Sequence, residues 1–332
     1  MAKKGGSMLT IVILNYNGWE DTIACLESLK CQNYTDYRVV VADNGSSDGS
    51  VSHFIEWATL HQTAHIVLEE GESAEREEWL TILRLSHNYG FARGNNLAIQ
   101  AMHSLPTDYW MCLNNDTIVT QECLSRLVEY ADNTPDVEAL TPAIRLHAQP
   151  DIMWNAGGRL VFGGRRYYCC MKPASTLHGK HVLDITFVTG CALMVRPALV
   201  ESGRLFTERF FFGEEDYEFS LLMKQQGRRM VCVLDAVIYH KVSASIKQIT
   251  SYNKLFIHSL NRLINLRQHY STVKYKILET LFYPYIRWRF LRKMTYRERQ
   301  KFLSLLRNES RNNEGVNFEL FNHYINYSFK DA

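Results

Sequence analysis

The sequence has little proline, 7 residues in 332, and no run of eighteen apolar residues uninterrupted by charge. It therefore lacks a candidate membrane-spanning helix, and its first residues, MAKKGGSML, lack the apolar stretch of a secretory signal. We expect a cytoplasmic protein. With 46% hydrophobic and 22% charged residues, the composition is globular rather than disordered or collagen-like. Residues 1–7 have the character of a tag or linker ahead of a native start at Met8.

The eight cysteines form no CxxC pair and show no Cys/His spacing suited to zinc. We expect reduced thiols, most of them buried.

The small net charge of +2 conceals a strong division along the chain. Residues 247–307 contain fourteen Lys and Arg but only Glu279 and Glu298, a net charge of +12, and the remainder carries −10. This asymmetry indicates an acidic body and a basic C-terminal region that meets an anionic surface.

The first part of the chain alternates between β-branched runs and amphipathic segments, which is typical of βαβ units in a parallel sheet. The sequence predicts strands at 9–14, 37–42, 80–85 and 109–113, and helices at 20–30, from 51 onwards, and at 92–103. Further on, it predicts a hairpin or excursion over 157–170, a strand at 185–195, a helix at 215–226 and a strand at 230–239. Three helical stretches should follow, at 250–270, at 273–307 with a break near Pro284, and at 316–328. We therefore expect an α/β catalytic domain over 8–245 and a basic helical region over 246–332.

Acidic residues stand at the ends of several predicted strands, at Asp43, Asp116 and the run Glu214-Glu215-Asp216. An aspartate after a strand is most often a turn or helix cap, so each position alone is weak evidence. In open α/β sheets, however, ligands bind at the carboxyl ends of the strands. The amides and carboxylate of Asn114-Asn115-Asp116 are the oxygen ligands that divalent cations bridging phosphates prefer.

Two of these positions leave alternatives open. A neutral His240 facing Asp116 can complete a Mn²⁺ or Mg²⁺ site, but a lone histidine at a strand end is usually structural. Asp43 can accept a hydrogen bond from a ring N–H of a nucleotide base, or it can form an Asx turn. Local sequence weighs the readings of Asp43 about equally.

Seven ordered blocks link these residues: VILNYNGWEDTIACLESL, VVVADNGSSDGS, LSHNYGFARGNNLAI, YWMCLNNDTIV, VTGCALMVRPALV, FFFGEEDYEFSLLMKQQG and AVIYHKVSAS. From about Leu9 to Ser245 the chain resembles a family 2 glycosyltransferase with the GT-A fold. This fold is a mixed, Rossmann-like sheet flanked by helices. The HNYGFARGNN, LNNDT and HKVSAS forms are most similar to a rhamnosyltransferase-like branch that acts in cell-surface polysaccharide assembly.

The resemblance assigns roles residue by residue. It implies that Tyr16 and Asp43 hold the base of a nucleoside diphosphate sugar, and that the segment of Asn88, Gly90 and Arg93 lies by the ribose and diphosphate. A guanidinium offers phosphate oxygens a charge-assisted fork.

Other roles concern the metal and the reacting groups. The Asn114-Asn115-Asp116 segment matches the DXD-type motif, whose last carboxylate ligates Mn²⁺ or Mg²⁺. Gly190 would let the backbone approach the sugars. Asp216 is the expected general base, and Glu215 and Glu214 are its nearest competitors. Glu215 and Lys241 are candidate acceptor-binding or supporting residues.

The function implied is that of an inverting, metal-dependent hexosyltransferase that moves a sugar to a saccharide acceptor, the acceptor being carried on a polyprenyl diphosphate lipid. The first expectation is L-rhamnose from dTDP-rhamnose, followed by UDP-linked hexoses. Two positions depart from the commonest form, because Asn114 replaces the first carboxylate of DXD and Glu218 stands where aspartate is frequent. The single carboxylate at NND keeps open a catalytically silent nucleotide-sugar binding module.

Other classes fit less well. A processive synthase would need a QxxRW motif and transmembrane helices, and a nucleotidyltransferase would need a Gly-rich phosphate loop near the N-terminus.

The basic segment YPYIRWRFLRKMTYRERQKF interleaves Trp288, Phe290, Tyr296 and Phe302 with cations. This pattern suits the cytoplasmic face of an anionic plasma membrane, or a helix packed on the catalytic body. No nucleic-acid motif accompanies the charge, so we expect no nucleic-acid partner.

Overall fold

The structure is a computed structural model that describes residues 6–242 and 251–329. Most of the expected tag, the end of the HKVSAS block and the expected boundary at 245/246 lie outside the described residues. The elements are, in chain order, β1 (Leu9–Asn15), α1 (Trp19–Lys30), β2 (Tyr37–Asp43), α2 (Ser50–Leu60), β3 (His65–Glu69), β4 (Leu80–Arg84), α3 (Phe91–Met102), β5 (Tyr109–Asn114), β6 (Thr117–Val119), α4 (Cys123–Asn133), β7 (Val137–Leu146), β8 (Ile152–Asn155), β9 (Gly158–Val161), β10 (Gly164–Tyr167), β11 (Lys172–Pro173), β12 (Val182–Ile185), β13 (Ala192–Val195), α5 (Glu215–Gln225), β14 (Arg229–His240), α6 (Ser251–His269), α7 (Thr272–Arg289), α8 (Tyr296–Asn312) and α9 (Phe318–Ile325). Two short 3₁₀ turns lie at 174–177 and 197–199.

A mixed sheet forms the centre of the body, in the order β11-β8-β7-β13-β5-β1-β2-β4-β3. Strands β5, β1, β2, β4 and β3 run parallel, while β13 is antiparallel to β5. Strand β14 adds to β7 and also pairs with β6 and β12. The expected α/β fold is confirmed, and the expected hairpin over 157–170 is present as β9 and β10.

Helices cover both faces of this sheet, which explains why β1 (LTIVILN) and β2 (YRVVVAD) are almost wholly apolar and buried. One apolar cluster includes Leu26 of α1, Phe54 of α2 and Leu127 of α4. The other includes Ile99 of α3 and Phe219 of α5. Five of the eight cysteines are buried and all are free, as the sequence predicts.

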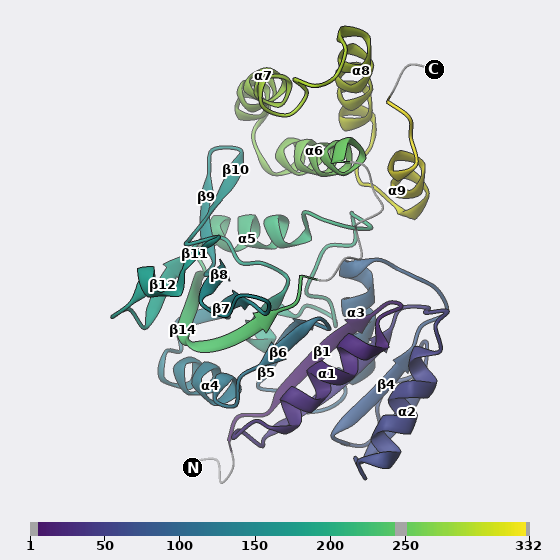
Figure 1. Cartoon of the computed structure of the whole chain (residues 1–332), viewed down its shortest axis with the longest axis vertical. Coiled ribbons are helices and arrows are strands. Elements are labelled where there is room, and N and C mark those ends of the chain that lie inside the picture. The colour runs from purple at the N-terminus through teal and green to yellow at the C-terminus, as the bar shows by residue number, and fades with distance from the viewer. Residues whose placement is uncertain (1–5, 243–250, 330–332) are drawn as a thin grey trace.

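The C-terminal helices lie together at one end of the molecule, above the sheet in Figure 1. Their apolar side chains form a cluster of their own, with Phe256 of α6, Ile286 of α7 and Phe302 of α8 at its centre. The cluster also takes in Phe210 from the body, where Phe210 and Val316 form a β-bridge. Within the described residues, no helix combines the length and apolar character that crossing a membrane requires.

Two expectations about elements are wrong, and for Phe302 the alternative of a packed helix is confirmed. The stretch 185–195 is not one strand, because β12 pairs with β14 whereas β13 pairs with β5 and β7, so residues 186–191 cross between distant parts of the sheet. No break occurs at Pro284, which lies inside α7. The break falls at 290–295, where Thr295 and Glu298 form a capping box that starts α8. Finally, Phe302 is buried, so it is not available to a membrane.

Candidate active site

The carboxyl ends of the parallel strands bring the polar residues to one edge. In the sheet register Asn15 of β1 is opposite Asp43 of β2, and Asp43 is opposite Arg84 of β4. On the other side of β1, Leu14 pairs with Asn114 at the end of β5. Parallel strands end together, so residues a hundred positions apart in the chain meet at this edge.

Asp43 is buried, and its carboxylate accepts from the backbone three residues on, one residue further than in an Asx turn. Its Oδ2 accepts from the Ser46 N–H at 3.1 Å, and its Oδ1 accepts from Ser46 Oγ at 2.6 Å and from Asn15 Nδ2 at 2.8 Å. Asp43 therefore has a structural role in the loop that follows β2. The same carboxylate also lines a cavity of about 410 Å³ together with Ser46, Glu70 and Arg84, which keeps it in reach of a bound molecule.

The remaining donor-side residues lie around this edge. Tyr16 is 51% exposed and available for stacking. Asn88 shapes its own turn, since its Oδ1 accepts from Asn44 Nδ2 and from the Gly90 N–H, both at 2.9 Å. Arg93 lies over the Tyr89 ring at 4.5 Å and has a 51% exposed side chain that faces Glu208 at 4.0 Å.

The backbone conformation at position 90 requires a glycine. Its φ of +80° and ψ of −177° fall in a region that only glycine adopts readily. A Cβ there would lie 2.0 Å from the Phe211 carbonyl oxygen. The turn that opens α3 therefore packs directly on the segment that leads to α5.

Asp116 and His240 are in contact although 124 positions separate them. Strand β14 pairs with β6, which places His240 opposite Thr117, directly after Asp116. The His240 Nε2 atom lies 3.0 Å from Asp116 Oδ1, and both side chains are mostly buried. The His240 ring also meets the Trp154 ring edge-on at 4.5 Å.

This pair fits part of a metal site. The separation of 3.0 Å is that of a direct hydrogen bond, and adjacent ligands of an octahedral ion with bonds of about 2.1 Å are about the same distance apart. The His240 Nδ1 atom is buried without a hydrogen-bond partner. No group of three or more His, Cys, Asp or Glu side chains that could hold a metal occurs in residues 6–242 and 251–329. Other ligands would have to come from donor phosphates and water.

Other residues near this pair have structural contacts. Asn115 Nδ2 donates to Thr22 Oγ1 at 3.0 Å, and so ties the strand end to α1. Lys241 Nζ binds Asp21 Oδ1 at 2.7 Å, and its backbone N–H donates to the Asp116 carbonyl. Lys241 thus fixes the Asp116 backbone from a neighbouring position.

The crossing segment 186–191 connects the strand ends to α5. At one end, the Cys191 carbonyl accepts from the Asn114 N–H at 2.8 Å. At the other, the Val188 N–H donates to Ser220 Oγ at 3.1 Å. A Cβ at Gly190, between them, would lie 3.1 Å from the Phe91 ring. One short segment thus contacts β5, α3 and α5.

The three consecutive carboxylates at the start of α5 have different surroundings. Glu214 is buried between Arg165 and Arg262, and these cations lower its pKa despite its burial. The Glu215 Oε2 atom is buried without a partner, and burial together with the adjacent Asp216 raises the Glu215 pKa to about 8. Glu215 therefore keeps its proton at neutral pH.

Asp216 differs from both neighbours. Its side chain is 17% exposed, and it forms a long ion pair with Arg165, 3.8 Å from Oδ1 to Nη1. Burial raises its pKa, and Arg165 opposes this shift. Asp216 is thus partly exposed and more basic than an ordinary aspartate, whereas one carboxylate oxygen of Glu215 is fully buried.

Sequence reasoning missed the cations that organise this cluster. Arg262 of α6 donates to both Glu214 oxygens, with Nη2 to Oε1 at 2.9 Å, and lies 3.7 Å from the centre of the Tyr217 ring. Arg165 of β10 reaches the same cluster from the hairpin. Their only sequence signal was the positive charge of their segments, which does not reveal a partner.

Glu218, the position that departs from the common pattern, is buried. It accepts from Thr207 Oγ1, from Arg209 Nη2 at 3.0 Å and from His269 Nε2 at 2.6 Å. Its contacts join α5 to α6, which is a structural role.

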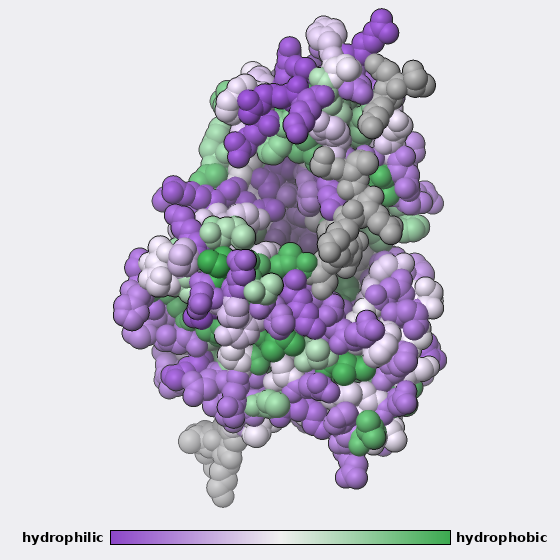
Figure 2. Space-filling view, viewed as in Figure 1, coloured by the Kyte–Doolittle hydropathy of each residue, from purple (hydrophilic) through white to green (hydrophobic). Residues whose placement is uncertain are grey.

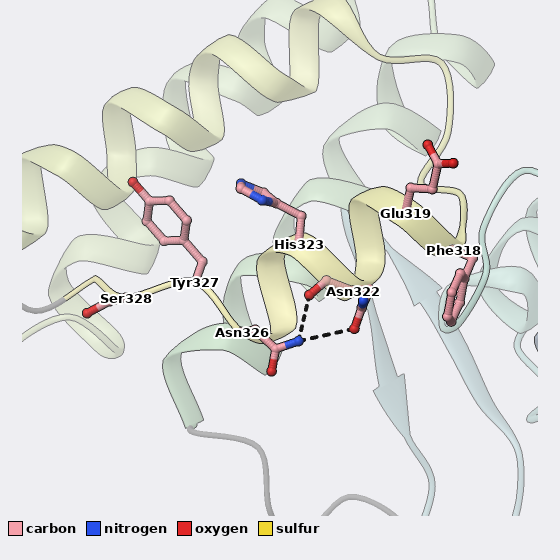
Figure 3. Close-up of a pocket in the computed structure, with 7 residues that line it drawn as sticks. All are labelled: Phe318, Glu319, Asn322, His323, Asn326, Tyr327 and Ser328. Carbon is pink, nitrogen blue, oxygen red and sulfur yellow. Dashed lines mark hydrogen bonds between the residues drawn. The ribbon is translucent and has the colours of Figure 1, made fainter.

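Figure 2 shows a hollow with hydrophilic walls between the C-terminal helices and the sheet-containing body. A separate cavity of about 630 Å³ lies beside α9. It is lined by residues of α9 and of the segment that follows: Phe318, Glu319, Asn322, His323, Asn326, Tyr327 and Ser328 (Figure 3). None of the residues that the sequence assigned to the site lines this second cavity. We therefore place the candidate site at the strand ends and the start of α5.

Comparison with known proteins agrees with this geometry. Residues 10–155 match the family model described as glycosyl transferase family 2. A stretch of 126 residues is 25% identical to the teichoic acid poly(glycerol phosphate) polymerase of Staphylococcus epidermidis. This match covers 38% of the chain but spans only 15% of that relative.

Solved structures share the fold at low identity. TarS 1-349 of S. aureus superposes with a TM-score of 0.56 and 14% identity, over 91% of this chain and 80% of that one, and its complex with UDP gives 0.57. A mannosyltransferase from Pyrobaculum calidifontis, in complex with GDP-Man and Mn²⁺, gives 0.52 at 15% identity, over 92% of this chain and 74% of that one.

The chain has a GT-A-type fold, and its residues 10–155 are similar to glycosyl transferase family 2. The expected fold and family are thus confirmed, and the rhamnosyltransferase-like branch stays a prediction.

Proposed function

We propose that the protein is an inverting, metal-dependent glycosyltransferase that moves a sugar from a nucleoside diphosphate donor to a saccharide acceptor in cell-surface polysaccharide assembly. In this proposal residues 8–245 form the catalytic domain and 246–332 a basic helical region. The observation that carries it is the contrast among the carboxylates of α5, which leaves Asp216 accessible while Glu214 is ion-paired and Glu215 keeps its proton.

The donor would occupy the strand-end side of the site. Tyr16 would stack on the base, and Asp43 would accept from it at the cavity it lines. The exposed guanidinium of Arg93 would bind the diphosphate, while Gly90 keeps the turn close to α5. Gly190 and the Asn114 segment would border the sugar.

Asp116 and His240 would hold a divalent ion, which when bound offsets negative charge on the departing diphosphate. The chain's own part in the chemistry is proton removal. Asp216 would take the proton from an acceptor hydroxyl as that oxygen forms a bond to the anomeric carbon. The bond from that carbon to the diphosphate breaks on the opposite face, so the product has inverted configuration.

Our first candidate donor is dTDP-L-rhamnose, on the similarity of the HNYGFARGNN, LNNDT and HKVSAS blocks. UDP-linked hexoses are the second, and the UDP complex of TarS supports testing them. We propose a polyprenyl-diphosphate-linked acceptor, which would place the enzyme at the cytoplasmic face of the plasma membrane.

A thermal-shift panel of dTDP, UDP and GDP, with and without Mn²⁺, tests the donor assignment. A ligand that binds only the folded state raises its apparent stability. We expect one nucleotide to raise Tm clearly, and its sugar to be transferred in a product assay. The absence of any shift with every nucleotide would contradict the proposal, whereas binding without turnover would favour a silent binding module.

The metal assignment is tested by Asp116→Asn. We expect Mn²⁺ to strengthen nucleotide binding to the wild type and to have no such effect on the variant. Asp151→Asn, on an exposed residue in the body, is the control and should behave as wild type. Equal strengthening by Mn²⁺ in Asp116→Asn would place the ion elsewhere.

A further inference from the structure

Helix α7 presents a row of large apolar side chains to solvent. The row consists of Val273, Ile277, Leu281, Tyr285 and Trp288, each 50–71% exposed. Spacings of four, four, four and three residues put them on one side of the helix. A surface helix normally turns its apolar side toward the core, so this row is unusual.

The core-facing side of α7 is already occupied by other residues. Tyr283 and Ile286 pack in the cluster formed with α6 and α8, and Tyr275 and Leu278 pack on Leu266 of α6. The exposed row is therefore additional to the apolar face that the fold needs. Helix α7 also lies at the outer edge of the helical region, at the upper left in Figure 1.

Positive charges border this row. Exposed cations of α7 and of the segment after it are Lys274, Lys276, Arg287, Arg289, Arg292, Lys293 and Arg297. The one acidic residue among residues 272–297 is Glu279, which is buried and binds Arg311 Nη2 at 2.9 Å. Residues 272–297 thus form a cationic stretch in which no exposed carboxylate offsets the positive charge, and the partly exposed Glu298 follows it.

An anionic bilayer matches both properties. Apolar side chains leave water at the level of the acyl chains, while Lys and Arg reach lipid phosphates. Tyr285 and Trp288 are the amphipathic residues that favour this interface. A second copy of the chain would bring two cationic surfaces together, so charge opposes self-association through this helix.

We propose that α7 lies in the plane of an anionic lipid bilayer, with Val273, Ile277, Leu281, Tyr285 and Trp288 inserted among the lipids and the flanking cations on the headgroups. This proposal rests on the membrane association in the proposed function, and it identifies the surface of the protein that makes the contact. Lipid binding is measured without donor or acceptor, so its failure is distinguishable from failure of the catalytic assignment.

The test is flotation of the full chain with vesicles of phosphatidylcholine alone, or of phosphatidylcholine with about one-third phosphatidylglycerol. We expect at least about tenfold stronger partitioning to the anionic vesicles. The double variant Leu281→Ser/Trp288→Ser, which keeps every cation, should reduce it about tenfold or more. The matched control is Leu60→Ser, on the 77% exposed last residue of α2, and should bind as wild type.

Nucleotide binding should be unchanged in both variants, which verifies that they are folded. Brominated acyl chains should quench Trp fluorescence of the wild type more than that of Trp288→Phe, which reports insertion rather than contact by charge alone. Equal recovery with neutral and anionic vesicles would overturn the proposal, as would wild-type binding by the double variant. Concentration-dependent dimers abolished by that variant would assign the row to self-association instead.

Discussion

Arg262 and Glu214 form a two-point ion pair between the C-terminal helices and the start of α5, with Arg262 Nη2 and Nε donating to the two carboxylate oxygens. Glu214 has a left-handed backbone, with φ of +77°. The pair therefore holds a backbone turn that precedes the candidate base Asp216 by two residues. The helical region thus contributes directly to the shape of the candidate active site.

Arg262→Ala should destabilise the protein, because it leaves a buried carboxylate with Arg165 as its remaining ion-pair partner. Removing one partner of a buried pair costs about 3–5 kcal/mol, and we expect the lower end here because Arg165 stays. Urea unfolding measures the change. The control Arg297→Ala removes an exposed arginine of the same region and should cost less than about 0.5 kcal/mol. Equal effects of the two variants would refute a structural role for the pair.

Glu215 should make stability depend on pH. Its pKa in the folded protein is raised to about 8, whereas an ordinary glutamate has a value of 4.5. Between these values the folded state holds a proton that the unfolded state has lost, so the free energy of unfolding falls as pH rises, by at most about 1.4 kcal/mol per pH unit.

Glu215→Gln should weaken this dependence, leaving the part that the raised pKa of Asp216 contributes, and the variant should be more stable than wild type at pH 8 but not at pH 4. Urea unfolding at several pH values measures both. Glu27→Gln, on an exposed residue of α1, should retain the wild-type slope. An unchanged slope in Glu215→Gln would show that another group is responsible.

Gly90→Ala should perturb the donor side of the site. The substitution combines an unfavourable backbone conformation with an overlap on the Phe211 carbonyl, and we expect a loss of about 2–5 kcal/mol. Gly227→Ala separates the two effects, since Gly227 has φ of +68° but open space around it, and should cost about 1 kcal/mol. Equal losses in thermal or urea unfolding would mean that the overlap with Phe211 relaxes freely.

The first strands of the sheet are predicted best, whereas α4 and β7 have no counterpart among the predicted elements. The β-branched runs of β1 and β2 and the apolar run of β5 are almost wholly buried, so local composition and tertiary position agree there. The edge strand β3 (HIVLE) is short and only half-buried, and the sequence does not predict it. In the helical region the sequence predicts a break near Pro284, but α7 continues through this proline. The next helix starts at the Thr295–Glu298 capping box.

The prediction of the candidate site from the sequence has the same limit. Strand-end positions such as Asp43 follow from topology, because parallel strands share an edge. The contact of His240 with Asp116 depends on the pairing of β14 with β6, and the ranking of the three α5 carboxylates depends on Arg165 and Arg262. Such long-range pairings leave no local pattern in a single sequence.

The most direct test of the account is the turnover of Asp216→Asn with the donor found in the nucleotide panel, measured together with nucleotide affinity. General base catalysis contributes about 10²- to 10⁴-fold, so we predict a fall in kcat of that size with an almost unchanged Kd for the nucleotide. Turnover equal to that of wild type would contradict the assignment of Asp216 as the base that activates the acceptor.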